Sequence, residues 1–592
     1  MRGWQRIGSP VIRAFCTRLR LLMTAFVLVV TAGCVSDEVK DYGLISSYQQ
    51  MLTELGPQRR ADREGRDPNE PLGLLTPVPT PASTEIEVTI DPNSGKHSYS
   101  LSIEEAIVRT LVSSPEIRVV SFDPSIAKEE ITRAAAEFDP TAFGRTNYEK
   151  EDNPVNSIFQ PGQSNARLLE AGIRQKTVLG SEWSLSYALT RGWDDLVGRT
   201  LATRYEPILV FAVRQPLLRN AWEAVNLAGV NIARLNHEIA LVGFRQKAEE
   251  ISTQTIAAYW QLSQTRRDLE IQQSLLNETT ETLQKVLGRK EIDATDVQIK
   301  QTEASLKSRE AVLIHVKKIV IDTQDALVRL MADPQMNLLS EAEIVPITTP
   351  DLAMTELNRE ELLRLAMNYN PAIQQARLAI AIADINIEFA KSQRMPRLDL
   401  VASSGFHGLD KSRGDSHDNM EDFASYALGF SLEFPLGNRQ RQAELMRRKL
   451  ERSRAVSALQ NTADKVAAVV KERIRRVETN HTEIQIQKDA VEAAGTHLHA
   501  LEETESVREK LTPEFLLVKL QAQEALAQAQ RAEVRAIVEF NISTAELAQA
   551  TGTVLKLHQV SAGSPVRSID ESISDQEIEA EQKEPNSAAE QK

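Results

Sequence analysis

The chain has 592 residues and a formal net charge of −14 at pH 7. Aromatic residues make up only 5% of it and glycines number only 25, a composition that favours long helices over a large sandwich or barrel. The acidic balance disfavours nucleic-acid binding, and two cysteines cannot build a disulfide framework or a cysteine-based metal site.

The N-terminus has the pattern of a secretory signal. Five arginines precede or border the apolar stretch 21–30, and small residues at 31–33 lead to Cys34. A stretch of about ten apolar residues is too short to span a bilayer, which takes about 20. Because the order resembles a bacterial lipoprotein signal, we predict that residues 1–33 are a lipoprotein signal peptide and that Cys34 becomes the lipid-carrying (palmitoylated) first residue. The alternative is simple cleavage that leaves Cys34 as a free thiol.

Two segments at the ends of the remaining chain lack the pattern of a folded domain. Residues 34–100 are polar, and five prolines lie between 68 and 81, which predicts a Pro-rich N-terminal tether. Residues 558–592 are rich in Glu, Ser and Gln and contain few large apolar residues, which predicts a disordered acidic tail.

An internal repeat relates residues 101–350 to residues 351–557. A Glu-Glu pair, a Pro and an Ile recur with the same spacing: Glu104, Glu105, Pro115 and Ile117 in the first copy, and Glu360, Glu361, Pro371 and Ile373 in the second. A Pro-Leu pair follows in each copy, at Pro216 and Pro435. The repeat predicts the same order of helices and strands in both halves.

Each copy is predicted to open with a short helix that stops before its Pro, because proline disfavours helical geometry at the preceding residue. In the second copy a helix over 373–394 and strands at 398–405 and 423–434 follow. From Tyr426 to Phe434, large apolar residues alternate with small or polar ones, which is typical of a strand with one apolar face.

The predicted β-hairpin region spans 141–214 in the first copy and 397–434 in the second. The first region alternates from Trp183 to Leu189 and leaves room for an extra hairpin around Gly180. No later segment is long and apolar enough for a transmembrane helix, so a membrane crossing would require strands that close into a barrel. Two hairpins cannot close one, whereas several chains together can.

After each Pro-Leu pair the period of apolar residues becomes helical. Neither 220–287 nor 438–511 contains a proline, and at 1.5 Å per residue each run could extend about 100 Å. Such lengths imply coiled-coil packing or a bent helix pair. Return helices are predicted at 293–331 and 513–551.

These pieces, in this order and twice over, resemble the TolC family of outer membrane efflux proteins across residues 101–555. The resemblance rests on short segments at the helix and strand ends: Ser114-Pro115-Glu116-Ile117, Met395-Pro396-Arg397-Leu398, Gln215-Pro216-Leu217-Leu218, Phe434-Pro435-Leu436-Gly437 and Thr551-Gly552-Thr553-Val554-Leu555. It implies a mainly α chain with β-hairpins. Long coiled-coil helices would form a trimeric α-barrel, and each subunit would contribute four strands to a shared transmembrane β-barrel.

The resemblance also implies a function. It describes a homotrimeric outer-membrane conduit of a tripartite efflux or type I secretion system, which docks with a periplasmic adaptor (a membrane fusion protein) and an inner-membrane pump. A lipid on Cys34 would anchor each subunit in the outer membrane. Such a conduit is no enzyme and needs no cofactor. The alternative interpretation is a periplasmic coiled-coil adaptor or structural lipoprotein without a pore.

Partner docking is expected at the tips of the two helical hairpins. Relatives usually have a glycine there, but Gly288 is about two residues out of place and the second tip has none. The expected docking residues are Arg289 and Lys290 on the first tip and Glu509 and Lys510 on the second. Asp293 and Asp296 could narrow the pore as an acidic ring, although a solvated helix N-terminus is the simpler explanation for them.

Two further expectations concern helix continuity and chemistry. Asp123-Pro124 is expected to break a helix that is continuous in relatives. His497 and His499 are two apart and so lie on different helix faces, which argues against a metal site. The chain has no Gly-rich phosphate loop, no Gly-x-Ser-x-Gly and no His-Glu-x-x-His, so no catalytic residues are predicted.

Overall fold

The computed structural model describes residues 88–90 and 97–557, except 158, 197, 199, 292–293, 334–335, 337–342, 355–356 and 508–511. All of them belong to the second of the two units into which the chain divides, Pro77–Lys592. The predicted signal peptide and acidic tail, most of the predicted tether, and Cys34, Asp293, Glu509 and Lys510 lie outside the described residues.

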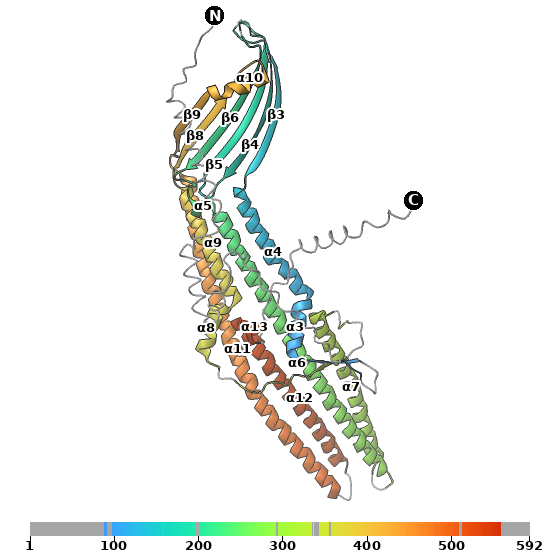
Figure 1. Ribbon diagram of the computed structural model, residues 1–592. Helices are drawn as coiled ribbons and strands as arrows, with labels where there is room; N and C mark the ends of the chain where they lie inside the picture. Colours follow the sequence, from blue (N-terminus) through green and yellow to red (C-terminus); the bar gives the residue numbers. More distant parts are fainter. Residues whose placement is uncertain are drawn as a thin grey trace, which may run out of the picture. The chain divides into compact units, whose positions relative to one another are not determined.

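The two repeats are visible as two sets of helices (Figure 1). The first set contains α3 (Ile103–Ser113), α4 (Pro115–Ala135), the short α5 (Glu223–Asn226), α6 (Ala228–Gly288) and α7 (Asp296–Met331). The second contains α8 (Arg359–Tyr369), α9 (Pro371–Gln393), α11 (Arg439–Val507), α12 (Pro513–Thr551) and the short α13 (Val554–Leu557). The chain is therefore mainly helical, as the sequence predicts.

Local chemistry explains where these helices begin. Pro115 and Pro371 are the first residues of α4 and α9, a position where the missing N–H of proline costs nothing. Ser102 caps α3 by accepting a hydrogen bond from the Glu105 N–H, and Asn358 caps α8 in the same way. The two repeats thus share the residues that start their helices as well as the order of those helices.

The expected break at Pro124 is wrong, because α4 runs through it. Proline removes one backbone hydrogen bond from a helix interior. Here the loss is offset by packing on α6, where Pro124 is buried and its carbonyl accepts a hydrogen bond from His237 Nδ1 at 2.9 Å. A prediction from neighbouring residues alone cannot include a contact between residues more than 100 positions apart.

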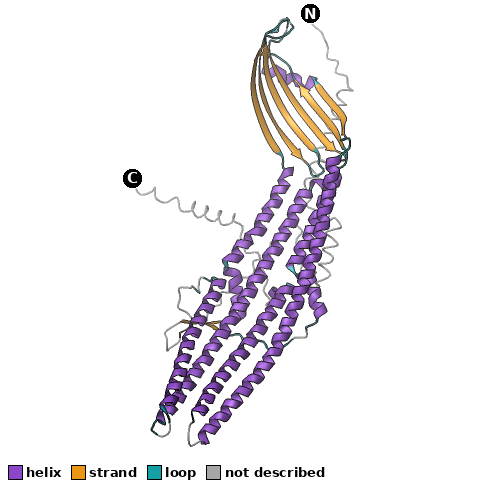
Figure 2. Ribbon diagram, turned by 180° about the vertical axis from the view of Figure 1, so that it is seen from behind, coloured by secondary structure: helices purple, strands orange, loops and turns teal. Residues whose placement is uncertain are grey.

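Six strands form one antiparallel sheet, separate from the helices in Figure 2. Its order is β3 (Thr141–Asp152), β4 (Gln163–Lys176), β5 (Glu182–Asp194), β6 (Thr203–Pro216), β8 (Arg397–His407) and β9 (Ala424–Glu433). The first repeat supplies four strands and the second two, so the expectation of four strands per chain is wrong. Gly180, at φ 85°, lies in the turn between β4 and β5, where a Cβ would approach the Asn220 carbonyl oxygen to 2.3 Å.

A second sheet has three strands, β1 (Val88–Ile90), β2 (His97–Leu101) and β7 (Glu343–Pro346). The first two fall within the range predicted as a tether. They are ordered by partners far along the chain, since β2 pairs in parallel with β7. The Tyr259 hydroxyl of α6 donates to the Leu101 carbonyl at 2.9 Å, which fixes this sheet against the helices.

The hydrophobic core lies among the helices rather than under the six-stranded sheet. One cluster surrounds Tyr259 and Leu262 of α6 and joins α3 and α7 of the first repeat to α12 of the second. Another cluster joins α8, α11 and α12 around Ile474 and Phe540. None of the described helices combines the length and hydropathy of a membrane span.

The region between β8 and β9 holds the short helix α10 (Arg413–Asp418) and a 3-10 turn (Asn419–Asp422). Ser412 caps α10 by accepting from the Asp415 N–H at 3.3 Å. The α10 helix lies against the sheet, where His417 Nε2 hydrogen-bonds the Tyr187 hydroxyl of β5.

Candidate functional site

One face of the six-stranded sheet is apolar. Directly paired residues of neighbouring strands point to the same face, so the register identifies its members. They are Tyr426, Leu428, Phe430 and Leu432 of β9, Leu398 and Leu400 of β8, Leu209, Phe211 and Val213 of β6, Trp183, Leu185 and Leu189 of β5, and Leu169 and Ile173 of β4. The face is continuous across five strands.

The opposite face of the same strands is mainly polar. It carries Arg174 and Glu170 of β4, Glu182, Ser184 and Thr190 of β5, Glu206 and Arg214 of β6, Asp399 and Ser403 of β8, and Ser425, Ser431 and Glu433 of β9. An apolar face backed by a polar one is the pattern of a strand between lipid and water.

Strand β9 shows how exposed the apolar face is. Tyr426, Leu428, Phe430 and Leu432 are 79%, 73%, 71% and 70% exposed. Scattered apolar residues are normal on a protein surface, but a contiguous set of this size marks contact with lipid or with another protein. Helix α10 covers the face in part, through the contact of His417 with Tyr187.

The two outer strands of the sheet, β3 and β9, each have one neighbour among the described residues. Their free backbone groups extend along 12 and 10 residues, and such edges invite pairing with another chain. On the apolar face β3 presents the small residues Ala142, Gly144 and Thr146 and then Tyr148 and Lys150, whereas β9 presents large apolar side chains. Over residues 142–146 the small side chains of one edge complement the large ones of the other.

The predicted docking residues lie at the tip that joins α6 to α7. Arg289 and Lys290 form the turn after α6, where the Arg289 carbonyl accepts from the Ala294 N–H at 3.0 Å. Asp296 is the first residue of α7 and is exposed, directly after Thr295, which makes a capping box with Gln298. The exposed position of Asp296 fits a solvated helix N-terminus. The docking role of Arg289 and Lys290 and the acidic ring at the pore both stay predictions.

The tip of the first hairpin packs against the second hairpin. Val286 of α6 and Ile299 of α7 are buried against Leu516 and Leu520 of α12. The two repeats therefore meet at this end through an apolar cluster, although the second tip itself lies among the residues that the structure does not describe.

Behind this cluster, a buried arginine links the hairpins. Arg309 of α7 is 7% exposed and donates from Nη2 to the Leu520 carbonyl at 2.9 Å and from Nη1 to Gln523 Oε1 at 3.3 Å. It also contacts Thr279 of α6, and Glu524 lies 3.6 Å from its Nε. Burial lowers the pKa of Arg309, while Glu524 and Glu278 raise it. Sequence analysis missed this residue because it lies in a polar run typical of a solvated helix.

Replacing Arg309 with alanine is expected to lower the free energy of unfolding by about 2 to 3 kcal/mol. The substitution removes a buried charged donor and leaves the buried Gln523 Oε1 without it. Chemical denaturation of the purified protein measures this. Lys307→Ala is the matched control, because Lys307 lies on the same helix with an exposed side chain. Equal unfolding midpoints for the two variants would contradict the assignment.

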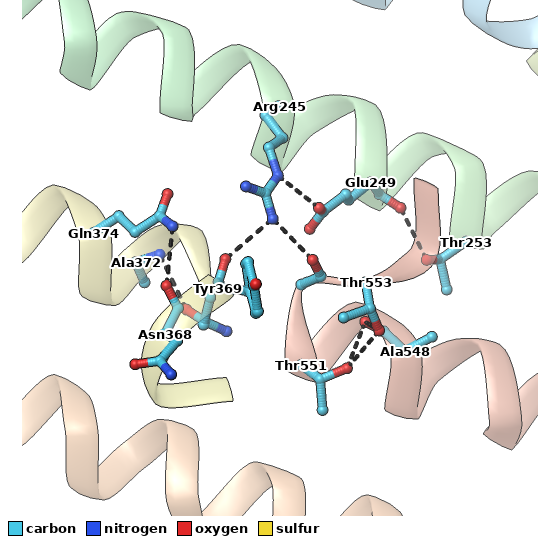
Figure 3. Close-up of polar contacts among 12 residues, drawn as sticks. Arg245, Glu249, Thr253, Asn368, Tyr369, Ala372, Gln374, Ala548, Thr551 and Thr553 are labelled. Atoms are coloured by element: carbon cyan, nitrogen blue, oxygen red, sulfur yellow. Dashed lines mark hydrogen bonds and ion pairs between the residues drawn. The ribbon is translucent and has the colours of Figure 1, made fainter. Parts of the chain in front are cut away.

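A half-buried arginine within α6 links the ends of two other helices (Figure 3). Arg245 of α6 donates from Nη2 to the carbonyl of Tyr369 at 3.1 Å and to the carbonyl of Gly552 at 2.8 Å. Its Nε pairs with Glu249 at 2.9 Å. Burial raises the pKa of Glu249, and the charge of Arg245 lowers it. This contact ties the first repeat to the end of α8 and the end of α12 in the second.

No group of three or more His, Cys, Asp or Glu side chains suited to a metal ion occurs among the described residues. His499 is exposed and lies 3.8 Å from Glu503 on the same helix.

Solved structures of outer-membrane proteins resemble this chain. VceC of Vibrio cholerae has a TM-score of 0.54 at 17% identity and covers 76% of this chain and 96% of its own. The CmeC outer membrane channel of Campylobacter jejuni gives 0.52 at 11%, covering 82% and 90%. The MtrE outer membrane channel of Neisseria gonorrhoeae gives 0.55 at 15%, covering 76% and 89%.

No protein-family model and no curated protein matches the sequence. At these identities the solved structures show the fold alone. That fold is the one of outer-membrane efflux channels, as the sequence resemblance led us to expect.

Proposed function

From the fold that it shares with outer-membrane efflux channels, we propose that this protein is a passive outer-membrane conduit. It would export substrates from the periplasm, or from an inner-membrane pump, to the exterior as part of a tripartite efflux or type I secretion system. The observation that carries the proposal is the six-stranded sheet connected to two long helical hairpins. Its apolar face is exposed, and its outer strands each have one neighbour among the residues that the structure describes.

The conduit would be a homotrimer with a shared β-barrel. Each chain contributes an even number of antiparallel strands, so β3 and β9 run in opposite directions and β3 of one copy can continue the sheet from β9 of the next. Three copies would give eighteen strands, and barrels of about 16 to 18 strands enclose a water-filled channel. The polar face of each sheet would line it, and the apolar face would contact lipid.

The long helices would form the trimeric α-barrel that crosses the periplasm, with the tips at its far end. Opening would be a shift between two packings of the hairpins, driven by partner binding. Contacts such as those of Arg309 join the parts that would move. A lipid on Cys34 would anchor each copy beside the barrel.

The periplasmic adaptor would dock at the tips. Replacing Lys290 or Glu509 with tryptophan is expected to reduce efflux at least about tenfold while trimers still form, because a buried interface centre tolerates few changes. Efflux of a fluorescent dye from cells and the size of the extracted protein measure the two effects separately. Lys300→Trp, on an exposed site of α7 outside the tip, is the control. Unchanged efflux in the tip variants would contradict the docking assignment.

Conductance tests the channel directly. The mature protein, purified in detergent and added to a planar lipid bilayer, is expected to insert and give discrete steps of ion current. A protein that binds vesicles through its lipid but produces no current would contradict the channel. That outcome would favour the alternative, a coiled-coil adaptor or structural lipoprotein without a pore.

A further inference from the structure

Four strands of the six-stranded sheet carry one row of aromatic and basic residues. Tyr148 of β3 lies directly opposite Arg167 of β4. Arg167 lies opposite Arg191 of β5, which in turn lies opposite Tyr205 of β6. Directly paired residues point to the same face of a sheet, so the four side chains share one face. It is the apolar face, because Leu189 belongs to that face and lies two residues before Arg191 on the same strand.

The row lies at the end of the strands that is far from the helices. The turn between β4 and β5 lies at the helical end, where the Trp222 N–H donates to the Leu179 carbonyl at 3.2 Å. Trp183 is on the apolar face near this turn, and Arg191 is about 26 Å further along β5 at about 3.3 Å per residue. At a strand tilt of about 35–45°, this length gives a height of about 20 Å, close to the apolar band of about 25 Å in membrane barrels. The row therefore marks the outer margin of the apolar face.

The basic side chains of this margin are exposed. Arg167 and Arg191 are exposed, as is Lys150, which follows Tyr148 by two residues on β3 and points to the same face. The Arg167 guanidinium carbon lies 5.4 Å from the ring centre of Tyr148, and that of Arg191 lies 5.9 Å from the ring centre of Tyr205. These cation–π contacts hold the two guanidinium groups at the surface. A ligand outside the sheet can therefore reach them.

In the part of the chain that the structure describes, no carboxylate pairs with these three cations. Arginines of the polar face do have such partners: Arg145 with Glu170, Arg204 with Asp194, Arg214 with Glu182 and Arg397 with Asp399. Arg167 and Arg191 instead face each other, and like charges directly opposite destabilise a sheet. Beyond Tyr205 the row meets Asp410, but its Oδ1 already accepts from the Lys411 N–H at 2.6 Å. An anion from outside the chain would offset the repulsion.

We propose that Lys150, Arg167 and Arg191 bind the phosphate groups of a lipid in the outer leaflet of the membrane. A guanidinium group matches phosphate with two parallel N–H donors, and basic clusters at a membrane surface attract anionic head groups. The inference rests on the proposed function, because it takes the apolar face to contact lipid. At the outer surface of an outer membrane, the lipid of this chemistry is a phosphorylated glycolipid.

Solvated cations at the membrane surface are the simpler alternative, since long basic side chains extend toward water there. Mere solvation would not require two arginines in directly opposed positions, which the register of β4 and β5 imposes. A phosphate between them turns the repulsion into two charge-assisted contacts. The bound lipid would also fix the depth of the sheet in the membrane.

Competition against a fluorescent lipid A, with the full mature protein in detergent, tests the proposal. Three competitors are used in separate arms: lipid A with both phosphates, the same lipid with its phosphates removed, and inorganic pyrophosphate. The phosphorylated lipid is expected to bind at least about tenfold more tightly than either of the others. Equal affinities for the two lipids would overturn the role of phosphate. Pyrophosphate that binds as tightly as the phosphorylated lipid would overturn the lipid as the source of the anion.

Variants locate the effect. Arg167→Gln combined with Arg191→Gln is expected to weaken lipid A binding at least about tenfold, because the charge-assisted contacts to phosphate are lost. The variant should fold, since both side chains are exposed and their mutual repulsion is removed. The matched control is Arg145→Gln combined with Arg214→Gln, which removes the same charge from exposed arginines of the polar face. If the two double variants bind lipid A with the same affinity, the proposal fails.

Native mass spectrometry of the purified proteins gives a second readout that needs no added lipid. Phosphorylated glycolipid is expected to remain bound to the wild type and to be lost from Arg167→Gln with Arg191→Gln. Equal retention by both proteins would overturn the assignment. Loss of lipid selectivity with an intact conductance leaves the channel standing. Phosphate-dependent lipid binding without conductance removes the channel instead.

Discussion

Replacing Phe430 with arginine is expected to keep the protein out of the outer membrane. Phe430 lies in the middle of β9 on the apolar face, where its side chain is 71% exposed. A charged residue on the lipid face of a transmembrane strand costs about 2 to 4 kcal/mol near the bilayer centre. The cost would be incurred once per chain, and therefore three times in a trimer.

The neighbouring residue provides the control. Ser431 is adjacent in the same strand and points to the polar face, so Ser431→Arg is expected to insert normally. Fractionation of cell membranes and gel analysis of unheated samples would show wild-type amounts of assembled protein for Ser431→Arg and little or none for Phe430→Arg. Equal assembly of both variants would show that the apolar face of β9 does not contact lipid.

Replacing Arg245 with methionine is expected to lower the free energy of unfolding by about 3 to 5 kcal/mol. Its partner Glu249 is 2% exposed, and removing the half-buried arginine leaves the buried carboxylate without a compensating charge. The carbonyl groups of Tyr369 and Gly552 would also lose their donor (Figure 3). Chemical denaturation would measure the loss, with Arg267→Met, an exposed arginine of α6, as control.

Two further measurements test whether the lost stability of Arg245→Met comes from the uncompensated charge of Glu249. Adding Glu249→Gln to Arg245→Met should restore part of the lost stability, because the buried charge is gone. Burial already raises the pKa of Glu249, and loss of Arg245 should raise it further. A carboxyl group whose folded pKa is raised stabilises the protein below its unfolded pKa, and this contribution is lost as pH rises through the folded pKa. The deficit of Arg245→Met should therefore be largest at pH values above the folded pKa of Glu249 and shrink as the pH falls through it, and a constant deficit would contradict the explanation.

Much of the helical architecture follows from local signals in the sequence. Pro371 and Pro513 set the starts of α9 and α12, and Gly552, at φ 71°, ends α12 where an αL residue is needed. The alternation from Tyr426 to Leu432 correctly predicted β9 and its apolar face. Such signals depend on residues that are close in sequence, which is why they could be read without a structure.

Other features depended on contacts between distant residues. Strands β3 and β4 carry charged residues such as Arg145 and Glu149 and alternate weakly, so the number of strands could not be counted from the pattern. The small sheet exists because β2 meets β7 from the far end of the first repeat. Arg245 and Arg309 resemble solvated arginines in sequence, and only their hydrogen bonds to other helices distinguish them.

The central claim is that three copies of this chain share one membrane barrel. Single-particle electron microscopy of the detergent-extracted mature protein tests it most directly. We expect a hollow particle with three-fold symmetry, in which β3 of each copy pairs with β9 of the next to give eighteen strands, six from each chain. A monomer, or a helical rod with no closed barrel at the end that carries the strands, would contradict it.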